Sequence, residues 1–322
     1  MEVESKRVGV IGVGHLGQHH ARVYTELLDA RLVGVVDVDE NRARFISENL
    51  RVPCYTSMEE LIERQAPEAL SIVVPTSLHH AIAKQALEMG IHVLIEKPVT
   101  TRPSEAEELL NIAARNDLVL QVGHIERFNS AIRYISRTVR APLFLESKRI
   151  GPFSPRINDV GVVLDLMIHD IDIILSLVPS EISRIAAMGR SVLTDHEDIA
   201  SAQITFENGA MAHIMVSRAA AKRTRQLDVM ERERHITVNY ETQDVRISRC
   251  VGDSEILERP VFPKSEPLKL ELAHFISCVR EKRQPLVGIR DGKRALEVAI
   301  EVLRQIHQPQ GKLFSKQMDC AS

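Results

Sequence analysis

A short glycine-rich segment limits the possible folds of this chain more than any other part of the sequence. Gly12-Val13-Gly14-His15-Leu16-Gly17 follows an apolar run and precedes a helical pattern. In such a G-x-G-x-x-G spacing, Gly12 permits a tight turn, Gly14 lets the backbone approach a pyrophosphate, and Gly17 lets helix and strand pack closely. The free N–H groups at the helix N-terminus then face the phosphates. The segment predicts a dinucleotide-binding turn, provided that its context agrees.

The context comes from an acid that ends the next strand-like run. Asp37 lies 20 residues after Gly17. In a dinucleotide-binding turn, an acid at this place accepts hydrogen bonds from the adenosine ribose hydroxyls, and its charge disfavours the extra phosphate of NADP. The next residue is Val38, so no Arg or Lys directly follows Asp37 to meet a 2′-phosphate. The sequence therefore predicts NAD as the cofactor, and a glycine turn without a cofactor is the alternative.

Residues 1–122 alternate short apolar runs with amphipathic stretches, which is typical of a doubly wound parallel sheet with helices on both faces. This half is therefore predicted to be an α/β Rossmann domain. His19 and His20 are expected on the exposed side of its first helix or near the phosphates, and Ser104 with Glu107 as a capping box. Strands are expected at 7–11, 31–36, 69–74, 92–95 and 118–122, and helices at 15–28, 41–49, 57–64, 79–89 and 104–116.

Residues 123–322 follow a different pattern, which predicts an α+β domain with a large, mostly antiparallel sheet. Asn208-Gly209 is well suited to a tight hairpin turn between two of its strands. Strands are expected at 143–149, 199–206, 210–217, 227–234, 235–239 and 244–249, and helices at 129–138, 159–177, 268–280 and 291–305, with a Gly/Pro/Ser-rich loop at 151–158.

Composition excludes several classes of protein. The net charge of −3 argues against a general nucleic-acid surface, which needs clustered positive charge. No apolar run approaches the roughly 18 residues of a membrane span, and no apolar leader is visible. The four cysteines are far apart, so we expect reduced thiols and neither disulfides nor a zinc site. The expectation is a cytoplasmic protein without a metal.

Two groups of residues indicate chemistry. Glu96-Lys97-Pro98 closes an apolar run at the sheet edge where open α/β folds bind ligands, and Lys97 can donate to a substrate hydroxyl there. Asp165 and His169 are four residues apart in an apolar helix, so they are expected on one helix face. A buried acid and imidazole are costly unless they are paired or used. A solvated Glu-Lys loop and a self-satisfied Asp–His pair are the alternatives.

Four segments, in this order and spacing, resemble the glucose–fructose oxidoreductase/inositol dehydrogenase family across nearly the whole chain. They are the glycine turn, Val74-Pro75-Thr76-Ser77-Leu78-His79, Glu96-Lys97-Pro98, and Gly161-Val162-Val163-Leu164-Asp165 continuing through His169 and Asp172. The resemblance implies NAD(P)-dependent oxidation of a sugar or polyol hydroxyl. It also implies a homo-oligomer, a dimer or tetramer, that commonly forms through one face of the second sheet.

The same resemblance assigns roles to individual residues. It implies Lys97 and His169 as the catalytic pair, with Asp165 beside them. One departure is Met167, where many members have glycine, and it affects the shape of the pocket. The implied cofactor-binding residues are Gly12, Gly14, His15, Leu16, Gly17, Asp37, Pro75, Thr76, His79, Glu96 and Lys97.

Within the family, three segments resemble one group, the bacterial UDP-N-acetylglucosamine 3-dehydrogenases. They are Gly123 to Asn129, Arg149 to Ser154, and Asp165 to Asp172, although Ser130 stands where that group usually has proline. The group implies oxidation of the glucosamine C3 hydroxyl to a ketone. A pyridoxal-phosphate aminotransferase would then use the product on a route to diamino-sugar lipid A.

A substrate with two phosphates needs cations near the pocket. The candidate substrate-binding residues are Arg127, Arg149, Arg156, Asp165 and His169, with Lys148, Arg218, Lys222 and Arg223 as further candidate cations. One alternative is a dehydrogenase of a free sugar or of a cyclitol such as inositol. An alternative of another class is a non-catalytic regulator that binds NAD.

Overall fold

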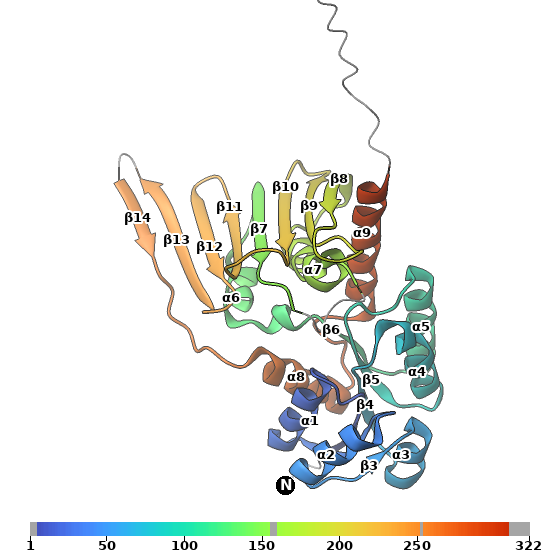
Figure 1. The fold of residues 1–322 in the computed structure, drawn as a ribbon. Coiled ribbons are helices and arrows are strands. Elements are labelled where there is room, and N and C mark those ends of the chain that lie inside the picture. Colours follow the sequence, from blue (N-terminus) through green and yellow to red (C-terminus); the bar gives the residue numbers. More distant parts are fainter. Residues whose placement is uncertain (1–4, 155–159, 252–253, 309–322) are drawn as a thin grey trace, which may run out of the picture.

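The protein consists of two sheets with helices packed against them. Its structure is a computed structural model that describes residues 5–154, 160–251 and 254–308. Figure 1 shows a smaller sheet that carries the N-terminus and a wide sheet at the other end of the molecule, with helices between and beside them.

The first sheet has six parallel strands in the order β3-β2-β1-β4-β5-β6. This is the order of a doubly wound dinucleotide-binding fold, so the predicted α/β class is confirmed. Burial on both faces explains the near-continuous apolar runs, since Val93, Leu94 and Ile95 are all fully buried. The strands are β1 (Lys6–Ile11), β2 (Ala30–Val36), β3 (Cys54–Tyr55), β4 (Ala69–Ile72), β5 (His92–Glu96) and β6 (Leu120–Gly123).

Helices cover both faces of this sheet. One core contains side chains of α3, α4 and α5 with the strands, and a second contains side chains of α1 and α2. The helices are α1 (Gly17–Glu26), α2 (Glu40–Leu50), α3 (Met58–Gln65), α4 (Thr76–Glu88) and α5 (Pro103–Arg115). At the start of α5, Glu105 accepts hydrogen bonds from the N–H groups of Thr101 and Arg102. The predicted capping box of Ser104 and Glu107 is therefore wrong, because the helix begins at Pro103 and its acidic cap lies two residues earlier.

The second sheet has eight strands in the order β14-β13-β12-β11-β7-β10-β9-β8. Only β7 and β10 pair in parallel, which confirms the mostly antiparallel prediction. Gly209, with φ of +86°, makes the predicted turn between β9 and β10. The strands are β7 (Phe144–Ile150), β8 (Ile182–Arg190), β9 (Ile199–Phe206), β10 (Met211–Ser217), β11 (Thr224–Met230), β12 (Arg234–Asn239), β13 (Asp244–Val251) and β14 (Ser254–Glu258).

One strand prediction in this sheet is wrong. The run 227–234 was expected as a single strand, but β11 ends at Met230 and β12 begins at Arg234. The charged residues between them form a turn in which the Glu231 N–H donates to the Arg234 carbonyl oxygen at 2.9 Å. In the first sheet, strand β3 was not predicted, because two residues are too few to show the alternation of a strand.

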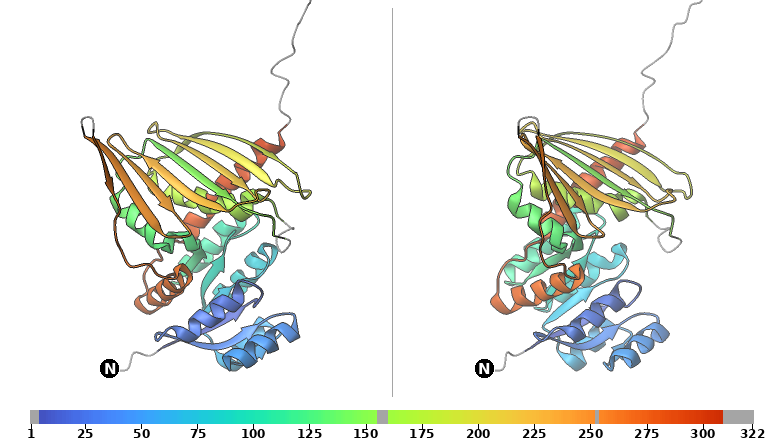
Figure 2. Two further views of the ribbon diagram at one scale, coloured as in Figure 1. Left: turned by 60° about the vertical axis from the view of Figure 1, so that its left-hand side comes forward. Right: turned by 90° about the vertical axis from the view of Figure 1, so that its left-hand side faces the viewer.

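Helices α6, α7 and α9 pack against one face of the eight-stranded sheet, where they share a single large core. No helix of the described chain covers the other face. Figure 2 shows the wide sheet with its helices on one side. The helical elements of this half are the 3-10 helix η1 (Ile125–Phe128), α6 (Ser130–Thr138), the π-helical turn η2 (Val163–Met167), α7 (Ile168–Leu177), α8 (Pro267–Glu281) and α9 (Ile289–His307). The expected helix 159–177 thus consists of two segments, and its first residue lies outside the described ranges.

Helices from the second half of the sequence complete the first sheet. Leu272 and Phe275 of α8 lie in the same core as Val8 and Val10 of β1, and Leu296 of α9 lies in the core of α4 and α5. The division at residue 122 into two separate domains remains a prediction, because α8 and α9 pack across it. This packing also brings η2 and α7 to the end of β5.

Candidate active site

The glycine turn has the geometry of a dinucleotide-binding turn. Gly12 has φ of +85°, and a Cβ atom there would lie 2.4 Å from the carbonyl oxygen of Val73. At Gly17 a Cβ atom would lie 1.9 Å from the carbonyl oxygen of Gly12. A Cβ at Gly14 would meet no atom within 4 Å, so that backbone stays open to a ligand. Each of the three positions therefore requires glycine for the physical reason that the spacing predicts.

Asp37 lies beside this turn and is buried. Its carboxylate accepts hydrogen bonds from the N–H groups of Val13 and Asp39, each at 3.0 Å. Arg42 of α2 also reaches it, with Nη1 3.2 Å from Asp37 Oδ1. The sequence interpretation considered only the residue after Asp37 and missed Arg42. The signal lay one helical turn further on, at the start of α2.

A cleft of about 560 Å³ adjoins the turn, and its lining includes Gly12, Gly14, Asp37, Arg42 and Pro75. This volume and these residues fit the adenosine and pyrophosphate parts of NAD. Thr76 is the first residue of α4, directly after Pro75. His15 and Leu16 are exposed at the N-terminal end of α1. The assignment of these residues to the cofactor stays a prediction.

His79 connects two loops at this sheet edge. It is buried, and its two ring nitrogens each lie 2.9 Å from a carbonyl oxygen, Nδ1 from that of Pro98 and Nε2 from that of Val74. Burial lowers the pKa of His79, although both carbonyls oppose that effect. Whichever nitrogen carries the proton, the ring holds the Lys97–Pro98 segment against the end of β4.

Glu96 points into the protein, away from solvent. Its Oε1 lies 3.2 Å from Nε2 of His20, which is fully buried, and its Oε2 accepts a hydrogen bond from the Lys97 N–H at 3.2 Å. The expectation that His20 lies on the exposed side of α1 or near the phosphates is therefore wrong. The inward face of α1 carries His20 and Tyr24 against Ser71 of β4, and a polar cluster replaces apolar packing there.

Lys97 meets the π-helical turn before α7. Its Nζ donates to the carbonyl oxygen of Asp165 at 2.7 Å and lies 3.3 Å from Asp165 Oδ1. π-helical turns are rare and are frequent at functional sites. Here the turn directs both a carbonyl and a carboxylate oxygen at one ammonium group. Asp165 therefore pairs with Lys97, and not with His169 as the alternative interpretation held.

His169 follows on the first turn of α7 and is partly buried. Its pKa lies well below the usual value, because burial disfavours the imidazolium and the nearby charge of Lys97 repels it. A neutral imidazole beside an ammonium group can accept a proton at neutral pH. Met167, where many family members have glycine, is fully buried in the core under the second sheet.

A second pocket, of about 170 Å³, contains Asp165 and several arginines. Its cations are Arg149, Arg218, Arg223 and Arg225, and Gly151 and Ser154 line it as well. Arg225, on β11, lies within the basic run of residues 222–225 but was not among the predicted substrate-binding residues. The pKa of Arg225 is lowered by burial and by the neighbouring charge of Arg149.

The structure places four of the candidate substrate cations in ion pairs, and Arg218 with Asp198 and Arg223 with Glu241 are two of these pairs. Arg149 is buried, with its Nε 2.7 Å from Asp170 Oδ2 and its Nη1 2.9 Å from Glu126 Oε1. Arg127 Nε lies 3.7 Å from Asp172 Oδ2. Arg156 lies outside the described residues. The roles of these arginines in substrate binding stay predictions.

The described residues include no group of three or more His, Cys, Asp or Glu side chains placed to hold a metal ion. Across the same ranges, no helix is both long and apolar enough to cross a membrane.

Comparisons with known proteins agree with this geometry. Residues 6–124 match the family described as an oxidoreductase family with an NAD-binding Rossmann fold, and residues 132–238 match the GFO/IDH/MocA C-terminal domain. The two matches include the strands of the first sheet and β7 to β11 of the second, and both Lys97 and the segment with Asp165 and His169 lie within them.

Two relatives illustrate the range of similar proteins. The chain is 35% identical over 303 residues to a UDP-N-acetylglucosamine 3-dehydrogenase of Acidithiobacillus ferrooxidans, with 92% of this chain and 96% of the relative covered. A solved structure of that dehydrogenase superposes with a TM-score of 0.89 and covers 94% of this chain and 98% of its own. The chain is also 28% identical over 314 residues to a scyllo-inositol 2-dehydrogenase (NAD(+)) of Bacillus subtilis, with 91% and 92% covered.

Proposed function

The chain belongs to the GFO/IDH/MocA oxidoreductase family, which has an NAD-binding Rossmann fold, and we propose that it oxidises the C3 hydroxyl of UDP-N-acetylglucosamine to a ketone. Support for this substrate comes from one observation, the arginine-lined pocket around Asp165. The similarity to a named UDP-N-acetylglucosamine 3-dehydrogenase, at 35% identity, points the same way.

Arg225 shows why this pocket favours a phosphorylated substrate. Its side chain is partly buried, and in the described part of the chain it makes no hydrogen bond or ion pair. Burying a guanidinium without a partner is costly, and the charges of Arg149 and Arg223 add to that cost. Two phosphate groups would supply the missing anions, and guanidinium donors fork onto phosphate oxygens. A free cyclitol would leave the cost in place.

The residues at the end of β5 and the start of α7 can perform the proton chemistry of the oxidation. When bound, NAD accepts the hydride from the sugar carbon. The hydroxyl proton must leave the same substrate, and neutral His169 is placed to take it. The Lys97 ammonium stabilises the developing alkoxide, and its charge keeps His169 neutral before the reaction. Asp165 holds Lys97 in this position.

NAD would be held by the turn Gly12–Gly17, by Asp37 at the adenosine ribose, and by Pro75 and Thr76 after β4. The extended cleft along these residues supports the assignment. Glu96 and His79 act beneath Lys97, where they fix the segment that carries it.

The test is an assay of NAD reduction with UDP-N-acetylglucosamine. We expect NADH to form, and the product to be a 3-keto sugar nucleotide by mass spectrometry. Because the equilibrium can favour the alcohol, the assay includes a keto-trapping aminotransferase or runs at raised pH. NADH from myo-inositol or a free hexose, with none from the trapped UDP-sugar reaction, would overturn the proposal.

The similarity to inositol dehydrogenases keeps a free sugar or cyclitol as the second candidate substrate. A non-catalytic NAD-binding regulator is disfavoured, since the chain combines family membership with the Lys97–Asp165 contact and a neutral His169. Binding of NAD without reduction by any hydroxylated sugar would support the regulator.

Three further proposals accompany the enzyme assignment. The uncovered face of the eight-stranded sheet, with partly exposed Met211 and Met215, would serve as the contact of a homo-oligomer, a dimer or tetramer. A pathway aminotransferase would consume the keto product. A cytoplasmic location is proposed, because NAD and nucleotide sugars are made there. Sedimentation analysis checks the first of these proposals, and fractionation checks the last.

A further inference from the structure

Three side chains behind the substrate pocket carry buried polar atoms that lack hydrogen-bond partners within the described residues. They are Nδ1 of His169, both ring nitrogens of His124, and Oδ2 of Asp172. Buried polar atoms are nearly always paired with protein or with ordered water. Four such atoms in one place therefore require an explanation.

The three side chains form a row that leads away from the substrate. The His169 and His124 rings are perpendicular, with centroids 6.5 Å apart. His124 Nδ1 lies 4.0 Å from Asp172 Oδ2. Neither pair makes a direct hydrogen bond, and an ordered water molecule in each gap would satisfy the unpaired atoms on either side. The row then becomes continuous from His169 to Asp172.

We propose that His124 and Asp172 form a proton relay that carries the substrate proton from His169 to the cleft on the far side of α7. The inference rests on the proposed function, in which His169 is the base. It adds two residues that touch neither substrate nor cofactor, and it assigns them the removal of the proton after each oxidation.

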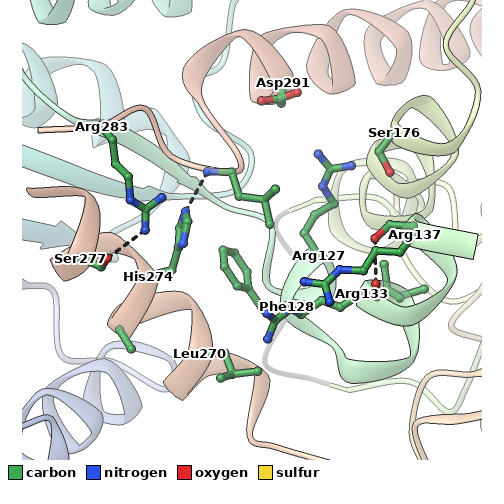
Figure 3. A pocket seen from close by; sticks show the side chains of 14 residues that line it. Arg127, Phe128, Arg133, Arg137, Ser176, Leu270, His274, Ser277, Arg283 and Asp291 are labelled. Carbon is green, nitrogen blue, oxygen red and sulfur yellow. Dashed lines mark hydrogen bonds between the residues drawn. The ribbon is translucent and has the colours of Figure 1, made fainter. Parts of the chain in front are cut away.

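The row ends at a large cleft. This cleft, of about 860 Å³, is lined by Arg127, Ser176 and Asp291 together with residues of α6 and α8. Figure 3 shows Arg127 between Ser176 and the arginines of α6, with Asp291 above it and Arg283 on the opposite side. Arg127 Nε lies 3.7 Å from Asp172 Oδ2, so Asp172 lies directly behind the wall of the cleft.

Each proton transfer in the relay is balanced. His169 accepts the hydroxyl proton on Nε2 and gives up the proton on Nδ1 to the first water. That water passes a proton to His124 Nε2, and His124 Nδ1 releases its own proton through the second water to the Asp172 carboxylate. Asp172 then releases the proton to water in the cleft beside Arg127. Rotation of the two imidazole rings restores their starting tautomers.

The charges around the row suit this direction of transfer. His124 faces the charges of Asp172, Lys97, Arg127 and Glu96, and burial lowers its pKa. Burial raises the pKa of Asp172, which Asp291 reinforces and the charges of His124 and Arg127 oppose. The carboxyl and imidazole pKa values thus approach each other, and transfer between groups of similar pKa is least costly.

The first experiment reads the histidine tautomers and needs no turnover. In protein with 15N-labelled histidine rings, we expect His169 as the Nδ1–H tautomer. His124→Phe removes the acceptor beyond Nδ1, so His169 should shift towards the Nε2–H tautomer. His307→Phe, on the exposed end of α9, is the matched control. An unchanged His169 tautomer in His124→Phe would overturn the relay. Should that variant not fold, His124→Leu, which also has no acceptor, replaces it with the same two outcomes.

The second experiment follows NADH and proton release together in one turnover with NAD and UDP-N-acetylglucosamine. In the unaltered protein, a pH indicator should report protons at the rate of NADH formation. In Asp172→Asn, NADH should form at an unchanged rate while proton release lags by about tenfold or more. Proton release that keeps pace with NADH would overturn the relay. If the unaltered protein forms no NADH, the proposed function fails, and the tautomer measurement still decides the relay.

Discussion

Lys97 Nζ donates a hydrogen bond to the main-chain carbonyl oxygen of Asp165 at 2.7 Å and lies 3.3 Å from the carboxylate of the same residue. The lysine comes from the end of β5, and Asp165 comes from the π-helical turn before α7. Their contact therefore connects the cofactor-binding sheet to the helix that carries His169. Because Lys97 is also a cause of the low pKa of His169, one side chain affects both the position and the protonation of the site.

Replacing Lys97 by methionine should change the rate and its pH dependence together. Turnover should fall about a hundredfold or more, with NAD binding retained. The Lys97 charge lowers the pKa of His169, so its removal raises that pKa. The base works when neutral and is lost as pH falls through its pKa, so the acid limb of the kcat/KM profile should move to higher pH. Lys264→Met, at an exposed ion pair, is the control. An acid limb that stays in place contradicts the assignment.

His169→Ala should also lose about a hundredfold or more in turnover.

Asp37→Ser should weaken the preference for NAD over NADP. The serine removes the charge that repels a 2′-phosphate, and it releases Arg42, which now lies 3.2 Å from the carboxylate. We expect about a tenfold gain in NADP affinity, which corresponds to about 1.4 kcal/mol, by fluorescence titration. Adding Arg42→Ala to Asp37→Ser should reduce the gain to the part that comes from removing the repelling charge. Tighter binding of NADP than of NAD to the unaltered protein would show that the cofactor preference has been misread.

Arg149→Met should destabilise the fold. The substitution leaves the carboxylates of Asp170 and Glu126 without their cation, and both the arginine and Asp170 are buried. Removing one partner of a buried pair typically costs about 3–5 kcal/mol of unfolding free energy, measurable by chemical denaturation. The control is Arg223→Met, because the exposed Arg223–Glu241 pair at 3.7 Å should contribute at most about 1 kcal/mol. Equal effects of the two variants would refute the distinction.

Arg225→Met should raise KM for UDP-N-acetylglucosamine by about tenfold or more, because one guanidinium contact to phosphate is lost. KM for any unphosphorylated sugar that the enzyme accepts should stay unchanged. Steady-state kinetics with both substrates makes the comparison, and Arg246→Met, on an exposed strand position, is the control. If both KM values rise equally, the arginine pocket does not select phosphate.

Much of the fold was predictable because its signals are local. The alternation of apolar runs and amphipathic stretches follows from burial on both faces of a parallel sheet, and Asn208-Gly209 marks a hairpin by its own conformational preferences. The failures were local too. A charged turn at residues 231–233 continues the strand pattern in composition, and the acidic capping residue of α5 is Glu105 and not Glu107, because the helix begins at Pro103.

The site was predictable where short-range geometry sets the chemistry. Gly12, Gly14, Gly17 and Asp37 act through one turn and the neighbouring strand end, so their spacing alone indicates a dinucleotide. His20 shows the limit of this reasoning. The sequence places it on α1, but only the packing of α1 over β4 turns it inward to Glu96.

By itself, the sequence determined the order of secondary structure, the glycine turn with its acid, and the residue types available for proton transfer. The tertiary structure decided which of these residues meet. Lys97 contacts Asp165, and Arg42 forms an ion pair with Asp37. Arg149 forms ion pairs with Asp170 and Glu126. These partners are chosen by the direction in which packed helices and strands present their side chains. A π-helical turn or a crossing helix sets that direction. The position of such an element depends on contacts between segments that are far apart in the chain.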